Sequence, residues 1–184
     1  RGFKGAGISA GIKSSGAKDL ALIVNEGPQI FGTAVFTSNQ VVAAPVIWSR
    51  EVIKDHSVAA VLLNSGGANA CTGPEGFADT HQSAEAVAET LGISASDTAI
   101  CSTGLIGVRL PMDAILSGVG SASQKLSGNS LLDLAEAIMT TDSKPKISRY
   151  EVNGATIVGI AKGAGMLAPA LATMLSVIMT DAIV

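Results

Sequence analysis

Charged side chains are scarce in this sequence, and aromatic side chains are scarcer still. Only 15% of the 184 residues are charged and 3% are aromatic, with one Trp and one Tyr. A typical soluble domain has about 25% charged residues, so the surface is not all ordinary solvated surface. Apolar residues make up 47% of the chain, and the core must be built from Ala, Val, Ile and Leu. This composition favours an α/β fold, in a chain long enough for one large domain.

Basic clusters, zinc motifs and a signal peptide are also absent. The net charge is −3 and no basic run exceeds two residues, which argues against a nucleic-acid partner. Cys71 and Cys101 are too far apart for a CxxC motif and lack a nearby pair of histidines. We therefore expect no metal site, and we expect both cysteines to be small buried side chains in a reducing compartment. Residues 1–11 lack the apolar stretch of a signal peptide, which favours a cytoplasmic protein.

One long segment carries no charge at all. Residues 163–180, between Lys162 and Asp181, are uncharged, and their number lies at the threshold for a transmembrane helix. Gly163, Gly165 and Pro169 interrupt the segment, and its hydroxyl side chains would face the lipid. We therefore expect no membrane span, and predict a buried strand or turn beside a reactive site.

The rest of the pattern predicts one layered α/β unit. Runs rich in β-branched residues predict strands, and the Gly-Pro turn between the first two predicts a hairpin. Residues 117–130 indicate an exposed connection between two helices. The strand-like run 173–179 either pairs back into its own sheet or shows that the chain is part of a longer protein, and the low charge favours the second. The predicted strands are 20–25, 31–37, 58–64, 98–102 and 156–161, and the predicted helical faces lie within 84–91, 112–119 and 131–138.

Three glycine-rich stretches are candidates for close approach to a ligand. GAGISA (5–10) matches the dinucleotide pattern G-x-G-x-x-A, but no strand precedes it and no acidic residue follows at the required spacing, which disfavours nucleotide binding. LNSGGANACTG (63–73) runs from a strand into a loop that either faces a ligand or is simply a tight turn. CSTGLIG (101–107) places Thr103 and Gly104 side by side at a strand end. A hydroxyl and an N–H in that position are suitable donors to an oxyanion.

Neither histidine is a convincing catalytic base. His56 and His81 lie in polar surroundings, and no nucleophile elbow G-x-S-x-G accompanies them. We expect His81 to be solvated. If the chain performs acyl chemistry, the known alternative base is the α-amino group of a threonine, which requires cleavage of the chain before that threonine.

Four motifs in sequence order give the chain a family resemblance. NSGGANACTG (64–73), CSTGLIG (101–107), AIMTTD (137–142) and KGAGMLAPALATML (162–175) together resemble the ornithine acetyltransferase family, the glutamate N-acetyltransferases of arginine biosynthesis. The resemblance covers nearly the whole chain. It implies a layered sheet-and-helix sandwich that is incomplete without a second chain. Residues 1–172 would form the α-chain domain, and residues 173–184 would begin the β-chain.

The resemblance also implies a site. The family cleaves itself at the position of Ala172 and Thr173, and Thr173 would then serve as nucleophile and substrate contact. Thr103 and Gly104 would form the oxyanion hole. The remaining implied substrate contacts are Lys162 and either Thr140 or Thr141, with a slight preference for Thr140.

The implied reaction moves an acetyl group from N-acetylornithine to glutamate through an acetyl-threonine, with acetyl-CoA as a second candidate donor and no metal or bound cofactor. The implied partner is a β-chain from the same precursor, in an αβ pair that assembles into a heterotetramer. A self-cleaving amidohydrolase or aminopeptidase and a catalytically silent fragment are the alternatives. The sequence departs from the family at Met179, where we expect a packing change only, and it continues past Thr173, although a mature α-chain would end at Ala172.

Overall fold

The computed structural model describes residues 1–165 and 172–182. Within that part of the chain, four strands form one sheet in the order β1-β2-β3-β4 and three form another in the order β5-β6-β7. The pairs β1/β2 and β2/β3 are antiparallel and β3/β4 is parallel. The second sheet is an antiparallel meander. The strands are β1 (Phe3–Ile8), β2 (Leu20–Asn25), β3 (Ala60–Gly67), β4 (Thr98–Leu105), β5 (Lys146–Val152), β6 (Ala155–Lys162) and β7 (Leu175–Thr180).

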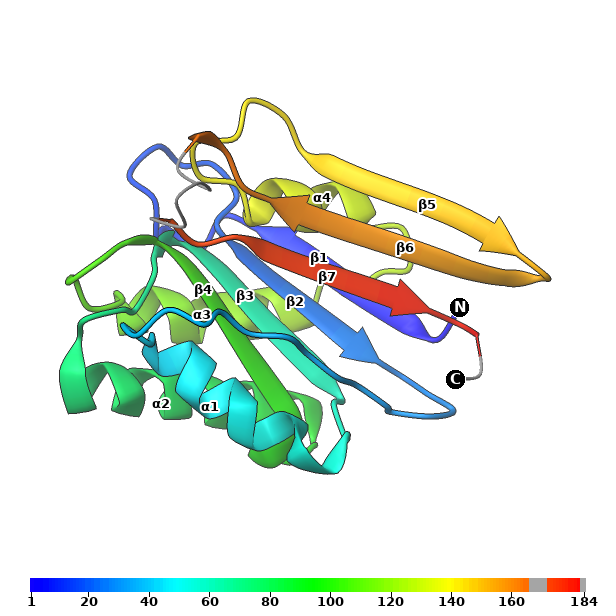
Figure 1. Cartoon of the computed structure of the whole chain (residues 1–184), viewed down its shortest axis with the longest axis horizontal. Helices are drawn as coiled ribbons and strands as arrows, with labels where there is room; N and C mark the ends of the chain where they lie inside the picture. The colour runs from blue at the N-terminus through cyan, green and yellow to red at the C-terminus, as the bar shows by residue number, and fades with distance from the viewer. Residues whose placement is uncertain (166–171, 183–184) are drawn as a thin grey trace.

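The four-stranded sheet is covered on both faces (Figure 1). Helices α1 (Ala44–Val52), α2 (Gly73–Leu91) and α3 (Met112–Ser123) cover one face, where Leu22, Leu62 and Ile100 are buried among helical side chains. Helix α4 (Leu131–Ala137) covers the other face together with β6 and β7. Short 3₁₀ turns at Ile53–Asp55 and Ala95–Asp97 precede β3 and β4. These layers confirm the predicted α/β sandwich.

The predicted helical faces and four of the five predicted strands are present. Helix α2 shows why its sequence is helical: proline stands in its first turn, and Gly92 ends it with a left-handed φ of 69°, the conformation that glycine adopts without steric cost. Ala84, Val87 and Ala88 face the core, as their spacing predicts. The helix carries the chain across from β3 to the parallel strand β4.

The predicted hairpin between 20–25 and 31–37 is wrong. The edge of β2 that it would occupy is taken by β1, and residues 31–37 form only an isolated bridge from Phe31 to Ser57. The side chain of Val35 is 98% exposed, so this apolar run has no core to face. The glycines of GAGISA lie in β1, where they allow α4 to come close: a Cβ on Gly7 would stand 2.0 Å from the carbonyl oxygen of Asp133.

Two further expectations need correction. Residues 117–130 are not all connection, because α3 continues to Ser123 and buries Val119 and Ala122 against the sheet. Only the part after the helix connects α3 with α4. Cys71 is exposed instead of buried, because it lies in the loop that precedes α2, with a left-handed φ of 58°.

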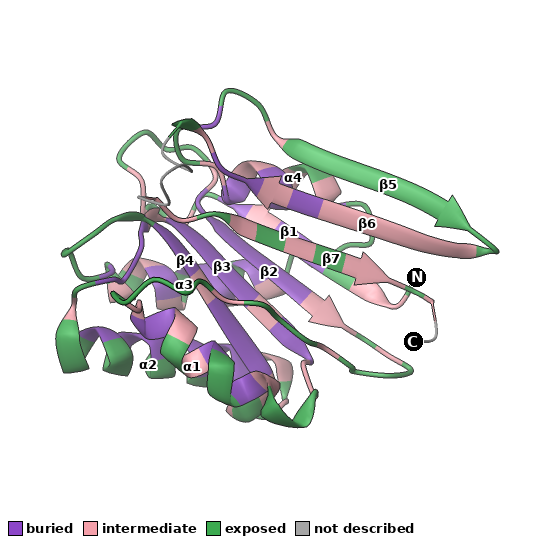
Figure 2. Cartoon of the chain, viewed as in Figure 1, coloured by how far each residue is buried: buried purple, intermediate pink, exposed green. Residues whose placement is uncertain are grey.

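The uncharged segment ends in a strand that pairs back into the molecule. Strand β7 lies beside β6, and its Leu175, Val177 and Met179 pack against the core formed with α4. The opposite face of β7 is open, with Ile178 71% exposed. Figure 2 shows the contrast, because β2, β3 and β4 are almost wholly buried whereas β5 is exposed along its length. Among the described helices, none has the length and apolar character needed to cross a membrane.

Candidate functional site

The ends of β3 and β4 approach each other with unusual closeness. Gly104 on β4 has a φ of +133° and lies against Gly66 and Gly67 of β3. A Cβ on Gly104 would stand 2.4 Å from the carbonyl carbon of Gly66, so only glycine fits at this position. The parallel register shifts at Gly66 and Gly67. This bulge places the exposed Gly104 immediately after the buried Thr103.

Lys162, at the end of β6, joins three of the predicted site threonines. Lys162 is only 4% exposed. Its Nζ donates to Thr140 Oγ1 at 2.6 Å, to Thr103 Oγ1 at 3.1 Å and to the carbonyl oxygen of Thr173 at 3.2 Å. An ammonium has three protons and no acceptor, so these bonds use its full donor capacity. Lys162 therefore connects the end of β4, the segment after α4 and the start of β7.

The hydroxyl of Thr103 remains able to donate. Because Lys162 can only donate to it, the proton on Thr103 Oγ1 is free to point to another acceptor. Thr103 is 1% exposed, and it lies beside the Gly104 backbone. The two residues have the donors that an oxyanion hole needs.

The two candidate threonines of MTTD differ in their contacts. Thr140 accepts the bond from Lys162, whereas the described contacts of Lys162 do not include Thr141. Both threonines are exposed. Of the two, Thr140 is therefore the one whose hydroxyl contacts Lys162.

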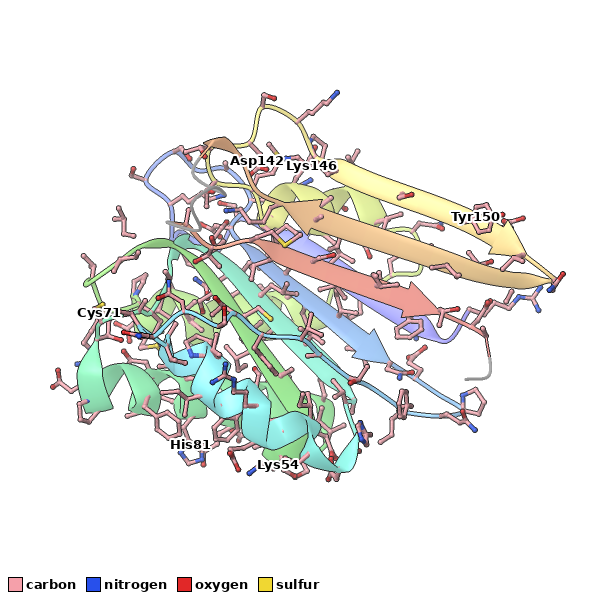
Figure 3. All side chains as sticks on the ribbon, viewed as in Figure 1. Lys54, Cys71, His81, Asp142, Lys146 and Tyr150 are labelled. Carbon is pink, nitrogen blue, oxygen red and sulfur yellow. The ribbon has the colours of Figure 1, made fainter. Side chains whose placement is uncertain are left out.

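Asp142 is a member of this cluster that the sequence analysis did not single out. Its carboxylate is 1% exposed and pairs with Lys146 at the start of β5, and Figure 3 shows the two side chains side by side. The carboxylate also accepts from the N–H of Gly163 at 2.8 Å and of Thr140 at 3.2 Å. Burial alone would raise the pKa of Asp142, but the hydrogen bonds from Lys146, Gly163 and Thr140 outweigh it and lower the pKa to about 2.

A second lysine contacts the same segment. Lys13 Nζ donates to the carbonyl oxygen of Met139 at 2.7 Å, next to Thr140 in the chain. The loop that carries Lys13 is held by the buried carboxylate of Asp19, which accepts the N–H groups of Ala10, Ile12 and Lys13 at 2.6–2.8 Å. Burial lowers the pKa of Lys13. The ammonium groups of Lys13 and Lys162 thus both donate hydrogen bonds to the Met139–Thr140 segment.

Ala172 and Thr173 are half-buried and precede β7. Thr173 is placed in the cluster by its carbonyl oxygen, through the bond from Lys162. The residues just before Ala172, including Pro169, lie outside the described part of the chain. The structure therefore brings together Thr103, Gly104, Thr140, Lys162 and Thr173, whereas the contacts described for Lys162 do not include Thr141.

The histidines lie elsewhere. His56 stacks on Phe31 with ring centroids 5.4 Å apart, and His81 lies 5.1 Å from the Trp48 ring with about half of its side chain exposed. Neither is bonded to the cluster around Lys162. Among the described residues, no group of three or more His, Cys, Asp or Glu side chains is arranged to hold a metal ion.

The fold has close counterparts among solved structures. The ornithine acetyltransferase of Mycobacterium tuberculosis, solved as a complex with ornithine, gives a TM-score of 0.83 at 48% identity, over 95% of this chain and 93% of that chain. The arginine biosynthesis bifunctional protein ArgJ of Bacillus halodurans gives a TM-score of 0.81 at 38% identity, over 95% of this chain and 92% of that chain. The architecture is therefore that of the ornithine acetyltransferases.

Sequence comparison extends this match along the chain. Residues 4–184 match the model of the ArgJ family. The arginine biosynthesis bifunctional protein ArgJ of Streptomyces coelicolor is 59% identical over 99% of this chain and 48% of its own length. Its namesake in Mycobacterium tuberculosis H37Rv is 55% identical over 98% of this chain and 47% of its own length. The chain belongs to the ArgJ family, and it spans about half the length of these relatives.

Proposed function

We propose that this chain is the α-chain, with the first residues of the β-chain, of an acetyltransferase that moves an acetyl group from N-acetylornithine to glutamate. The observation that carries the proposal is the convergence of Thr103, Thr140 and Thr173 on the buried Lys162 ammonium. One of these threonines lies at the predicted cleavage position, and another is paired with a glycine N–H at a strand end. Family membership supports the substrate class.

The first step is self-cleavage between Ala172 and Thr173. Thr173 Oγ attacks the carbonyl carbon of Ala172, the peptide nitrogen leaves as the Thr173 amine, and an ester joins the two residues. Water then hydrolyses the ester, which releases the Ala172 carboxylate and restores the hydroxyl. The new α-amine has an ordinary pKa of ~7.7–8.0, so it is a suitable base near neutral pH and stands on the same residue as the nucleophile.

Acetyl transfer then proceeds in two half-reactions. Thr173 Oγ, with its proton taken by the α-amine, attacks the acetamide carbonyl of N-acetylornithine. The hydroxyl of Thr103 and the N–H of Gly104 hold the negative charge of the tetrahedral intermediate. Ornithine leaves with the proton, and an acetyl ester remains on Thr173. The amine of glutamate attacks this ester, which forms N-acetylglutamate and frees Thr173. Acetyl-CoA is a second candidate donor for the first half-reaction.

Lys162 and Thr140 position the substrate in this scheme. A buried ammonium is a suitable partner for the substrate α-carboxylate. All three donors of Lys162 have acceptors in the described chain, so the carboxylate must displace one of them. The bond to the Thr173 carbonyl oxygen is the longest of the three and the least costly to exchange.

A second chain completes the molecule in this proposal. The outer face of the β5–β7 sheet exposes Tyr150 to 65%, Val152 to 40% and Ile178 to 71%. This apolar face needs a cover, and the chain spans only 48% of a close relative. We assign the cover to the β-chain from the same precursor, in αβ pairs that assemble into a heterotetramer.

The test uses the full-length polypeptide, including any sequence beyond Val184. Its intact mass should show two chains divided before Thr173. Incubation with N-acetylornithine alone should add one acetyl mass to the peptide that begins at Thr173, and glutamate should remove it as N-acetylglutamate. Acetate release without transfer would instead support the amidohydrolase alternative. An acetyl group on Ser102, Ser65 or a cysteine would overturn the assignment of the nucleophile.

A further inference from the structure

The Asp142 carboxylate contacts both segments that carry the substrate-binding side chains. It accepts the N–H of Gly163, which follows Lys162 in the chain, at 2.8 Å. It also accepts the N–H of Thr140, whose hydroxyl is the shortest contact of Lys162. The Asp142 side chain is 1% exposed and lies outside the threonine and lysine set assigned above. It therefore links the backbone of Thr140 to that of Gly163, the residue after Lys162.

We propose that Asp142 is a positioning residue, which sets the place of the Lys162 ammonium and the Thr140 hydroxyl by holding the N–H groups of Gly163 and Thr140. The inference rests on the proposed function only where it concerns the substrate. Two side chains join the end of β6 to the segment after α4 by described hydrogen bonds, namely Lys162 and Asp142. Without the Asp142 carboxylate, only the bond from Lys162 remains. Misplacement by about 1 Å of a positioning group is enough to slow a reaction by on the order of 10²-fold.

Asp142 also acts on the charge of Lys162. Burial lowers the pKa of Lys162, the carboxylate of Asp142 opposes that change, and the ammonium of Lys146 adds to it. Lys13 also lies close enough for its charge and that of Lys162 to repel, and the carboxylate of Asp19 opposes this effect on Lys13. The α4 carboxylates Asp133 and Glu136 pair with Lys18 instead. Asp142 and Lys146 thus shift the pKa of Lys162 in opposite directions. In the proposed function, this ammonium receives a substrate carboxylate.

This opposition separates a positioning role from a merely structural one. Asp142→Asn keeps the shape and one carbonyl acceptor but removes the negative charge. Lys146→Met removes the positive charge that faces Asp142 and repels Lys162, and it does so at a half-exposed side chain. If both residues only stabilised the fold, the two variants would impair the protein in the same direction. If the Asp142 carboxylate is held beside the Lys162 ammonium, as proposed, the pH dependence of the two variants should move in opposite directions, because the two charges shift the pKa of Lys162 in opposite directions.

The matched controls come from the same part of the chain. Lys144→Met makes the same charge change as Lys146→Met, two residues earlier, at an exposed lysine for which the described residues provide no ion pair. Asp133→Asn removes a carboxylate from α4 that pairs with Lys18 and is 48% exposed. Neither control side chain contacts Lys162, Thr140 or Gly163.

The experiment measures the KM for N-acetylornithine against pH in the full-length enzyme and its four variants. A charged Lys162 binds the substrate carboxylate, so KM rises as pH passes the pKa of Lys162. We expect this rise to begin at lower pH in Asp142→Asn and at higher pH in Lys146→Met, whereas both controls follow the wild type. At a pH on the alkaline limb the two variants should differ in KM by on the order of tenfold. Equal profiles, or shifts in the same direction, would overturn the inference.

A second readout does not depend on activity. The ε-carbon signal of Lys162, in protein labelled with ¹³C at lysine Cε and assigned by its loss in Lys162→Met, reports the pKa of the ammonium directly. The pKa of Lys162 should be highest in Lys146→Met, intermediate in the wild type and lowest in Asp142→Asn.

If the wild type neither cleaves itself nor transfers acetyl, the proposed function fails, while this order of pKa values still tests the role of Asp142. If Asp142→Asn does not fold, Lys146→Met against Lys144→Met decides the question, because an unchanged Lys162 signal in Lys146→Met contradicts the inference.

Discussion

The four-stranded sheet and the three-stranded sheet bury their side chains to very different extents. In the first, Leu20, Leu22 and Leu63 are fully buried between layers of structure. In the second, β5 is exposed throughout and β6 and β7 are mainly half-buried (Figure 2). The first sheet is covered on both faces, whereas the outer face of the second has no cover among the residues that the structure describes.

The candidate site lies where these two unequal sheets meet. Thr103 and Gly104 come from the four-stranded sheet, where Gly104 packs so closely on Gly66 that no side chain fits between them. Lys162 ends β6, and Thr173 lies just before β7. In the proposed mechanism, the oxyanion donors stand on the sheet that is covered on both faces, whereas the nucleophile and the substrate-binding lysine stand beside the sheet that we assign to the junction with a second chain.

The largest expected effect comes from removing the proposed nucleophile, Thr173, which lies just before β7. Thr173→Ala should leave the full-length precursor uncleaved and abolish acetyl transfer, because no Oγ remains for the acyl shift or for acetylation. Thr173→Ser should keep both activities in weaker form, since hydroxyl and amine remain while the methyl that restricts χ1 is lost. Intact mass and a transfer assay measure the two activities. Two chains from the Thr173→Ala precursor would contradict the mechanism at its first step.

The next largest effect comes from removing the proposed oxyanion donor Thr103, which lies in β4 of the four-stranded sheet. Thr103→Ala should slow acetyl transfer by on the order of 10²–10³-fold, because one oxyanion donor is lost. The bond from Lys162 is lost with it, so Thr103→Ser serves as the control that keeps the hydroxyl. Near-normal turnover in Thr103→Ala would make Thr103 a structural residue. A variant that cleaves itself but does not transfer acetyl would show that the two reactions use different oxyanion donors.

Much of the four-stranded sheet and part of the site could be predicted from the sequence. The β-branched runs at 58–64 and 98–102 identify β3 and β4 because buried strands select such residues. Lys162 stands out as the last charge before a long uncharged run. Its contacts with Thr103 and Thr140 could not be predicted from spacing, because they depend on three segments that only the fold brings together.

The missed elements were missed for physical reasons. The middle of β1, residues 5–7, is Gly-Ala-Gly, because α4 packs directly on Gly5 and Gly7, and these small residues have little strand propensity. Strand β5 is exposed and carries Lys146 and Arg149, so it lacks an apolar run. Asp142 is one polar residue in a polar segment, and its importance comes from an N–H group 21 positions away in the chain.

Stability measurements sharpen the contrast between the two sheets. In the full-length protein, Leu22→Ala should lower the free energy of unfolding by about 2–5 kcal/mol, because it opens a cavity in a closed core. Ile178→Ala tests whether the open face is covered. If the β-chain packs on it, as proposed, the loss should reach about 2 kcal/mol or more. Denaturant unfolding measures both values, and a change below about 0.5 kcal/mol for Ile178→Ala would indicate that the face stays exposed to solvent.

The smallest expected effect concerns the acid side of the stability curve, at the edge of the three-stranded sheet. The pKa of Asp142 is lowered from 3.8 to about 2 in the folded chain. A lowered pKa means that the folded state holds the proton less tightly than the unfolded state, so the carboxylate stabilises the fold fully above pH ~4 and loses this effect as pH falls toward about 2. The stabilisation amounts to about 2 kcal/mol. The difference in unfolding free energy between wild type and Asp142→Asn should therefore shrink as pH falls through this window. Asp133→Asn, at a half-exposed carboxylate on α4, provides the comparison, and an identical pH dependence in the two variants would show that the partners of Asp142 do not set its protonation.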